Sequence, residues 1–247
     1  MIKKRTIMGM PVTINIAEKK AKEEDINEIF SYLHYMDEKF SPYKSGSEVS
    51  KINRREIREA DYSREMKQIL RLSDETKKET FGYFDVYYKG HFDPSGIVKG
   101  YAIYKSSEIL RKRGYGNFYV EIAGDIEVRG KNGQEPWKVG IQNPFNLKEI
   151  VKILFLSNRG IATSGAYRRG LHIYDPLSKD TADEIASITV IGKNVFEADR
   201  LATAAFAMGN RGINFLENLK GVEAYMIRKD RKAVFTSGFK NYIKDIN

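Results

Sequence analysis

The sequence predicts a single α+β domain in which packed helices cover mixed or antiparallel sheets. Two observations indicate this class. Helical and strand patterns are interleaved without the regular alternation of a doubly wound fold. No linker, repeat or low-complexity tract divides the 247 residues, of which 41% are hydrophobic and 30% charged. We therefore expect one domain over residues 1–247.

The N-terminal half is predicted to hold one strand and three helices. Residues 12–18 alternate apolar and polar side chains, as a strand with one buried face does. Residues 23–40 place their apolar side chains on one helical stripe, and residues 66–80 and 98–113 follow the same period. Gly114 is the expected stop of the third helix, because glycine tolerates the left-handed backbone that ends many helices.

The C-terminal half is predicted to be richer in strands. Residues 118–128 and 137–142 show strand patterns, and the Asn132-Gly133 pair between them is a hairpin signal. Residues 196–209 are small and apolar, which predicts a buried helix. The further strands that we expect are at residues 150–156, 187–191 and 224–228.

The amino-acid composition excludes several classes of site and function. The absence of cysteine excludes disulfides, zinc–thiolate sites and thiol catalysis, and three histidines argue against a histidine-rich metal centre. No apolar run approaches the ~18 residues of a membrane span, so no transmembrane segment is expected. The basic residues 1–10 lead into no apolar stretch, so we expect no signal peptide in this sequence. The chain would then be cytoplasmic as it stands, or extracytoplasmic if a leader has been removed.

The charge of the chain points to an anionic ligand of unspecified kind. A formal net charge of +9 fits nucleic acid, an acidic membrane surface or a phosphate-bearing ligand. Lysine and arginine are, however, spread along the sequence instead of forming a basic block. We therefore expect no nucleic-acid partner.

Asp199 and Thr203 are the most informative pair of side chains. Four residues apart on a helix, they share one face, with Cβ atoms roughly 5–6 Å apart. A carboxylate and a hydroxyl are both oxygen donors, which suits a hard cation such as Mg²⁺. A second interpretation stays open, in which Asp199 complements the helix dipole and Thr203 bonds back to a carbonyl.

Three further segments carry polar residues of ambiguous meaning. Residues 93–100 lead into a helix, where a Ser-Gly turn and Lys99 would suit a phosphate, although an ordinary helix start has the same pattern. Residues 162–165 fit either a phosphate loop or a strand that ends in a turn. His172, before an Asp-Pro turn, fits either a general base or a loop cap.

In their order and spacing these segments resemble the ApbE family of flavin transferases. The resemblance runs from Met8-Gly9 to about Gly221. The segments that carry it are Met8-Gly-Met10, Phe40 to Asn53, Gly82-Tyr-Phe-Asp85, Asp93 to Ala102, Ala123-Gly-Asp-Ile126, Ala162-Thr-Ser-Gly-x-Tyr167, His172-Ile-x-Asp-Pro176 and Ala198-Asp-x-x-Ala-Thr-Ala204.

The resemblance implies a T-fold-related flavin transferase domain that moves FMN from its substrate FAD to a serine or threonine hydroxyl of an acceptor flavoprotein, with release of AMP. It implies Mg²⁺ bound by Asp199, Thr203 and the backbone carbonyl of Gly96. His172 would lie near the reacting phosphate, where its ordinary pKa of about 6.5 suits a general base. The residues that would line the FAD site are Met8, Tyr43, Tyr83, Phe84, Asp85, Asp93, Lys99, Thr163, Ser164 and Ile173.

The chain departs from the family pattern at three places, none of which is an implied metal ligand. Tyr104 replaces an aspartate, Ala123 replaces a glycine, and Leu177 to Lys179 replace an Arg/Lys-Thr-Gly triplet. Two other functions remain open on the same residues. Water in place of the acceptor hydroxyl would make the chain a Mg²⁺-dependent FAD pyrophosphatase that yields FMN and AMP, and absence of turnover would make it a flavin-binding protein.

Overall fold

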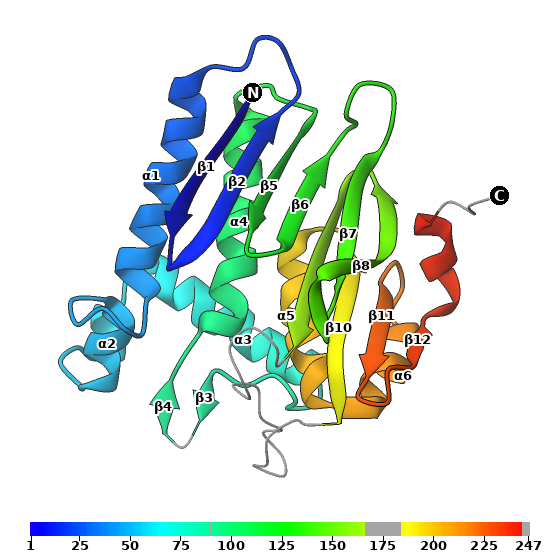
Figure 1. Cartoon of the computed structure of the whole chain (residues 1–247). Helices are drawn as coiled ribbons and strands as arrows, with labels where there is room; N and C mark the ends of the chain where they lie inside the picture. The colour runs from blue at the N-terminus through cyan, green and yellow to red at the C-terminus, as the bar shows by residue number, and fades with distance from the viewer. Residues whose placement is uncertain (89, 166–183, 244–247) are drawn as a thin grey trace.

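Eight strands form one antiparallel sheet in the computed structural model of the chain, which describes residues 1–88, 90–165 and 184–243 (Figure 1). Their order across the sheet is β1-β2-β5-β6-β9-β10-β11-β12. Their bounds are Ile2–Ile7 (β1), Met10–Ile16 (β2), Phe118–Ile122 (β5), Asp125–Arg129 (β6), Arg159–Gly165 (β9), Ile185–Gly192 (β10), Glu223–Arg228 (β11) and Ala233–Phe235 (β12).

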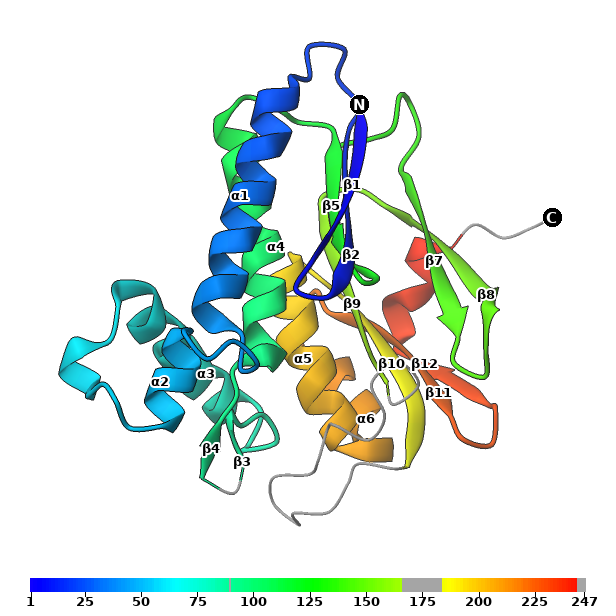
Figure 2. The same ribbon diagram turned by 60° about the vertical axis from the view of Figure 1, so that its left-hand side comes forward.

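The two faces of this sheet are covered differently. Helices α1 (Glu23–Phe40), α4 (Ser95–Lys112) and α5 (Val195–Ala207) lie on one face, and the hairpin of β7 (Trp137–Asn143) and β8 (Asn146–Leu156) lies over the other (Figure 2). The remaining elements are smaller. They are α2 (Glu48–Asn53), α3 (Arg64–Glu79), α6 (Gly212–Glu217), the short strands β3 (Tyr87–Tyr88) and β4 (His91–Phe92), and three 3₁₀ turns at Glu59–Asp61, Gly209–Arg211 and Ser237–Tyr242.

The helical predictions are confirmed closely. The helix predicted at residues 23–40 is α1, with the same bounds, and its apolar stripe is buried in the main core. The predicted helices at 66–80 and 196–209 are α3 and α5, shifted by one or two residues. Gly114 follows α4 with a φ of 81°, as a helix stop of this type requires. The buried members of the α1 stripe are Ile26, Ile29, Phe30, Leu33, Met36 and Phe40.

Two strand predictions are wrong in detail. Residues 118–128 form two strands instead of one, because Ala123 and Gly124 adopt φ values of 51° and 97° and turn the chain back. The Asn132-Gly133 turn forms, but it joins β6 in the main sheet to β7 in the separate hairpin, so it links no paired strands. Strand β1 was not predicted.

The α+β class with antiparallel sheets and packed helices is confirmed. Among the residues that the structure describes, no helix is long and apolar enough to cross a membrane.

Candidate functional site

The candidate site is centred where α4 and α5 touch. Asp199, in the middle of α5, is only 4% exposed, and its Oδ2 accepts a hydrogen bond of 2.8 Å from the backbone N–H of Gly100 on α4. A β-carbon at Gly100 would lie 2.7 Å from Asp199 Cβ and 3.0 Å from the carbonyl oxygen of Val195. Glycine is therefore the residue that lets the two helices approach this closely.

Gly96 lies one helical turn before Gly100 on α4. In a regular α-helix the carbonyl of Gly96 and the N–H of Gly100 face each other, and this N–H donates to the Asp199 carboxylate. A β-carbon at Gly96 would lie 3.4 Å from Thr203 Cγ2 and 3.8 Å from Thr203 Oγ1. The structure thus brings Gly96, Asp199 and Thr203, the three expected metal ligands, to one place.

Lys99 gives this cluster its positive charge. Its Nζ forms an ion pair with Asp125 Oδ2 and lies 3.5 Å from Asp199 Oδ1. Burial raises the pKa of Asp199; the Lys99 ammonium opposes this shift, and the charge of Asp125 adds to it. Two buried carboxylates and one ammonium leave a net negative charge, which a divalent cation would compensate.

Asp125 is a member of the cluster that we did not assign from the sequence. It begins β6, is 2% exposed, and its Oδ1 accepts a hydrogen bond of 3.0 Å from the backbone N–H of Thr163 on β9. The signal that would have found it is the Ala-Gly-Asp-Ile segment, since the tight Ala123-Gly124 turn places the next side chain at the end of the sheet.

Thr163 and Ser164 lie on β9, so residues 162–165 form a strand and not a phosphate loop. Because side chains alternate along a strand, the two face opposite sides of the sheet. Ser164 faces the helices and is 8% exposed. Thr163 faces the opposite side of the sheet, where its hydroxyl lies 2.9 Å from the hydroxyl of Thr189. His172 and Ile173 lie outside the described residues.

Two neighbouring aromatic residues precede α4. Phe84 is buried, with its Cε2 3.4 Å from the position that a Gly96 β-carbon would take. Tyr83 is half-buried, and its hydroxyl accepts a hydrogen bond of 2.7 Å from Arg211, which follows α5. Arg211 also stacks over the Tyr83 ring at 5.5 Å. No motif in the sequence analysis singled out this arginine.

The other residues expected to line the FAD site have local roles in the protein. Asp85 forms a 2.7 Å ion pair with Lys77, and Asp93 accepts a 2.9 Å hydrogen bond from the N–H of Ser95 at the start of α4. Met8 lies in the β1–β2 turn with a φ of 57°. Tyr43 is 94% exposed, between α1 and α2.

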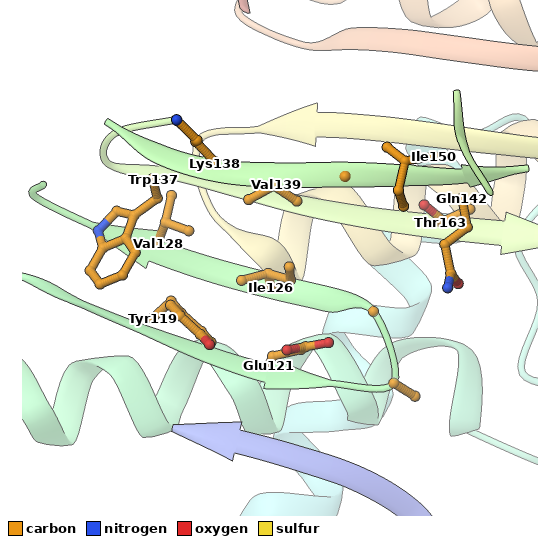
Figure 3. Close-up of a pocket in the computed structure, with 13 residues that line it drawn as sticks. Tyr119, Glu121, Ile126, Val128, Trp137, Lys138, Val139, Gln142, Ile150 and Thr163 are labelled. Atoms are coloured by element: carbon orange, nitrogen blue, oxygen red, sulfur yellow. The ribbon is translucent and has the colours of Figure 1, made fainter. Parts of the chain in front are cut away.

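A cavity of about 330 Å³ lies on the opposite face of the sheet, beneath the β7–β8 hairpin. Figure 3 shows Tyr119, Glu121 and Ile126 on the sheet side of this cavity, and Trp137 and Gln142 on the hairpin side. Among the residues that the structure describes, Thr163 is the one expected FAD-site residue in its lining. The cavity is therefore distinct from the α4–α5 junction, although both meet at the end of β9.

The donor set at the junction fits a hard cation. A carboxylate, a hydroxyl and a carbonyl are all oxygen ligands, as Mg²⁺ prefers. Among residues 1–88, 90–165 and 184–243, no three or more His, Cys, Asp or Glu side chains are grouped as a metal site. A cation here would accordingly depend on the Gly96 carbonyl and on ligand oxygens as well as on Asp199 and Thr203.

Comparison with known proteins identifies the family. The sequence model of the ApbE family matches residues 8–93 and 88–226, so the chain belongs to the ApbE family. It is similar to the FAD:protein FMN transferases of Klebsiella pneumoniae (30% identity over 162 residues, 61% of this chain and 45% of the relative) and Vibrio cholerae (31% over 164 residues, 62% and 47%). These matches span about half the length of the relatives.

Solved structures support the same fold. The ApbE protein of Thermotoga maritima superposes with a TM-score of 0.88 at 21% identity, and 99% of each chain is covered. The flavin transferase ApbE of Vibrio cholerae superposes with a TM-score of 0.85 at 23% identity, with 98% of this chain and 99% of that one covered.

Proposed function

We propose that this chain is a Mg²⁺-dependent FAD:protein FMN transferase. The observation that carries the proposal is the α4–α5 junction, where Gly100 allows the two helices to approach closely and Asp199 and Thr203 lie beside the first turns of α4, which contain Gly96. The family membership and the activity named for its relatives support the same reading. The acceptor is a protein that offers a serine or threonine hydroxyl.

Magnesium would be held by Asp199, Thr203 and the Gly96 carbonyl. When bound there, Mg²⁺ would neutralise the charge of the FAD diphosphate and of the transition state. Lys99 adds a point charge from the same helix, and its position between Asp125 and Asp199 holds the ammonium at the cluster. With the cation bound, the site would therefore supply positive charge where a diphosphate needs it.

The remaining expected residues would hold the dinucleotide. Tyr83, Phe84, Asp85 and Asp93 precede α4, while Met8 and Tyr43 come from turns near the start of the chain. Tyr43 would stack on an aromatic ring of FAD, which an exposed ring can do without repacking the core. Thr163 and Ser164 would contact the diphosphate region, and Ile173 would complete the site.

The proposed transfer of FMN needs no oxidant or reductant. The acceptor hydroxyl oxygen attacks the FMN phosphorus, the bond from that phosphorus to the bridging oxygen breaks, and AMP leaves with that oxygen. His172 takes the hydroxyl proton. A positioned base is needed because a hydroxyl is a poor nucleophile until its proton is removed.

One incubation tests the proposal. The chain is mixed with FAD, Mg²⁺ and a library of threonine-centred peptides, and the products are analysed by mass spectrometry and chromatography. Peptide that carries FMN, with an equal amount of AMP, is the expected result. Free FMN and AMP alone would identify an FAD pyrophosphatase, and bound FAD without AMP would identify a flavin-binding protein; either overturns the transferase assignment.

A further inference from the structure

Glu127 is a buried carboxylate to which the proposed chemistry gives no role. It lies on β6, two residues after Asp125, and is fully buried. Its Oε2 accepts a hydrogen bond of 2.6 Å from the backbone N–H of Val195, and its Oε1 forms an ion pair of 2.7 Å with Arg129. An ionisable group is rarely buried this completely unless specific contacts hold it.

The partner of Glu127 is the first residue of α5. A helix start leaves several N–H groups without partners and carries a partial positive charge, so a carboxylate is favourable there. Asn194 caps one of these groups through a 2.9 Å bond from the N–H of Glu197, and Glu127 takes that of Val195. A β-carbon at Gly160 on β9 would lie 1.8 Å from the Val195 nitrogen. The start of α5 is therefore held against β6 and β9 at once.

The spacing along β6 matches the spacing along α5. Glu127 and Asp125 are two residues apart on one face of the strand, or roughly 7 Å. Val195 and Asp199 are four residues apart on one face of the helix, or roughly 6 Å. One strand thus contacts the beginning of α5 directly through Glu127, and through Asp125 it meets the Lys99 ammonium that lies beside Asp199.

We propose that Glu127 is a positioning residue of the metal site: its carboxylate sets the place of α5 on the sheet and so brings Asp199 and Thr203 to the Gly96 carbonyl. The inference rests on the proposed function, because it concerns the metal site of that function. It assigns Glu127 no contact with FAD or metal. Loss of its hydrogen bond would let the start of α5 shift against β6, and Asp199, one turn further on, would shift with it.

Glu48 provides a matched control. Its carboxylate accepts 2.7 Å hydrogen bonds from the N–H and the hydroxyl of Ser63, the residue that caps α3. Like Glu127, it is a poorly exposed acid that holds a helix start and has a cationic neighbour, Lys39. Helix α3 carries none of the three expected metal ligands. The Glu48→Ala substitution should therefore destabilise the fold without changing the metal site.

The test measures metal binding without turnover. Mn²⁺, which takes the same oxygen ligands, is titrated into the full chain without FAD, and free Mn²⁺ is read by electron paramagnetic resonance. Substitution of a residue that holds a metal ligand in place typically lowers metal affinity by about 10–100-fold. We expect Glu127→Ala to lose about that much, Glu127→Gln to stay within about threefold because its amide oxygen still accepts the Val195 N–H, and Glu48→Ala to match the parent. FAD affinity should change little in each.

Thermal unfolding of the same variants separates positioning from general stability. If Glu127→Ala fails to fold, Glu127→Asp replaces it, since a side chain shorter by one methylene must draw α5 toward β6 and weaken Mn²⁺ binding. Parent-like Mn²⁺ affinity in folded Glu127→Ala or Glu127→Asp, or an equal loss in Glu48→Ala, would overturn the inference alone. A parent chain that binds no Mn²⁺ would overturn the metal site of the proposed function and this inference with it.

Discussion

Gly100→Ala tests whether the close approach of α4 and α5 depends on this glycine. The added β-carbon would lie 2.7 Å from Asp199 Cβ, 2.9 Å from its Oδ2 and 3.0 Å from the Val195 carbonyl. In a helix interior, alanine is more favourable than glycine by about 1 kcal/mol. Overpacking of a core costs about 1–3 kcal/mol, and the hydrogen bond to the Asp199 carboxylate is worth about 1.5–3 kcal/mol. We expect a net loss of about 1.5–5 kcal/mol in unfolding free energy.

Urea denaturation of the parent, Gly100→Ala and Gly96→Ala measures this loss. Gly96 lies on the same helix, but its added β-carbon would meet Phe84 and Thr203 at 3.4 Å, where small shifts of side chains relieve the contact. Gly96→Ala should therefore lose at most about 1 kcal/mol, because the helix preference of alanine offsets the crowding. A Gly100→Ala chain as stable as the parent would refute the reasoning about this junction.

Four further outcomes follow from the site. Asp199→Ala should abolish Mg²⁺-dependent FAD turnover with the fold intact, because it removes the anionic ligand; turnover at the parent rate with the same Mg²⁺ dependence would contradict this. Burial raises the pKa of Glu127 to about 7, from an ordinary value of 4.5, while Arg129 opposes the shift. The folded chain therefore keeps a proton that the unfolded chain releases. Between about pH 5 and about pH 8 the parent should lose about 2–3 kcal/mol of unfolding free energy, whereas Glu127→Gln should not show this loss. Denaturation of both proteins at the two pH values measures the difference. His172→Asn should slow single-turnover FMN transfer by about 10²–10⁴-fold with little change in FAD affinity; near-normal transfer with a lowered melting temperature would assign a loop cap instead. The chain should bind FAD more tightly than FMN in fluorescence titrations, and equal affinities would exclude an adenosine subsite.

Local patterns in the sequence determined the helices. The stripe of α1 has the helical period over 18 residues, so its bounds and its buried face follow from residue types alone. The small side chains of α5 likewise indicate a buried helix, and the Asp199–Thr203 spacing places a carboxylate and a hydroxyl on one of its faces. These features depend on residues within one or two turns of each other, and the sequence displays them directly.

Strand boundaries were harder to predict from the sequence than helix boundaries. Residues 118–128 keep their alternation through Ala123 and Gly124, so the alternation by itself does not mark the reversal of the chain there. Residues 162–165 carry the small polar residues of a loop, yet they pair with β10 and form β9. In both segments hydrogen bonding to other strands decided the structure, and this bonding depends on residues distant in sequence.

The sequence by itself determined the family resemblance, the α+β class and the oxygen character of the expected metal ligands. Only the tertiary structure decided how these ligands meet. The Gly100–Asp199 bond joins residues 99 positions apart, and the Glu127–Val195 bond joins residues 68 positions apart. Burial of a carboxylate in this way leaves no local pattern in the sequence, because the helix start or amide that accommodates the carboxylate comes from a distant segment. The roles of Asp125 and Glu127 therefore became visible only once β6 and α5 were placed together.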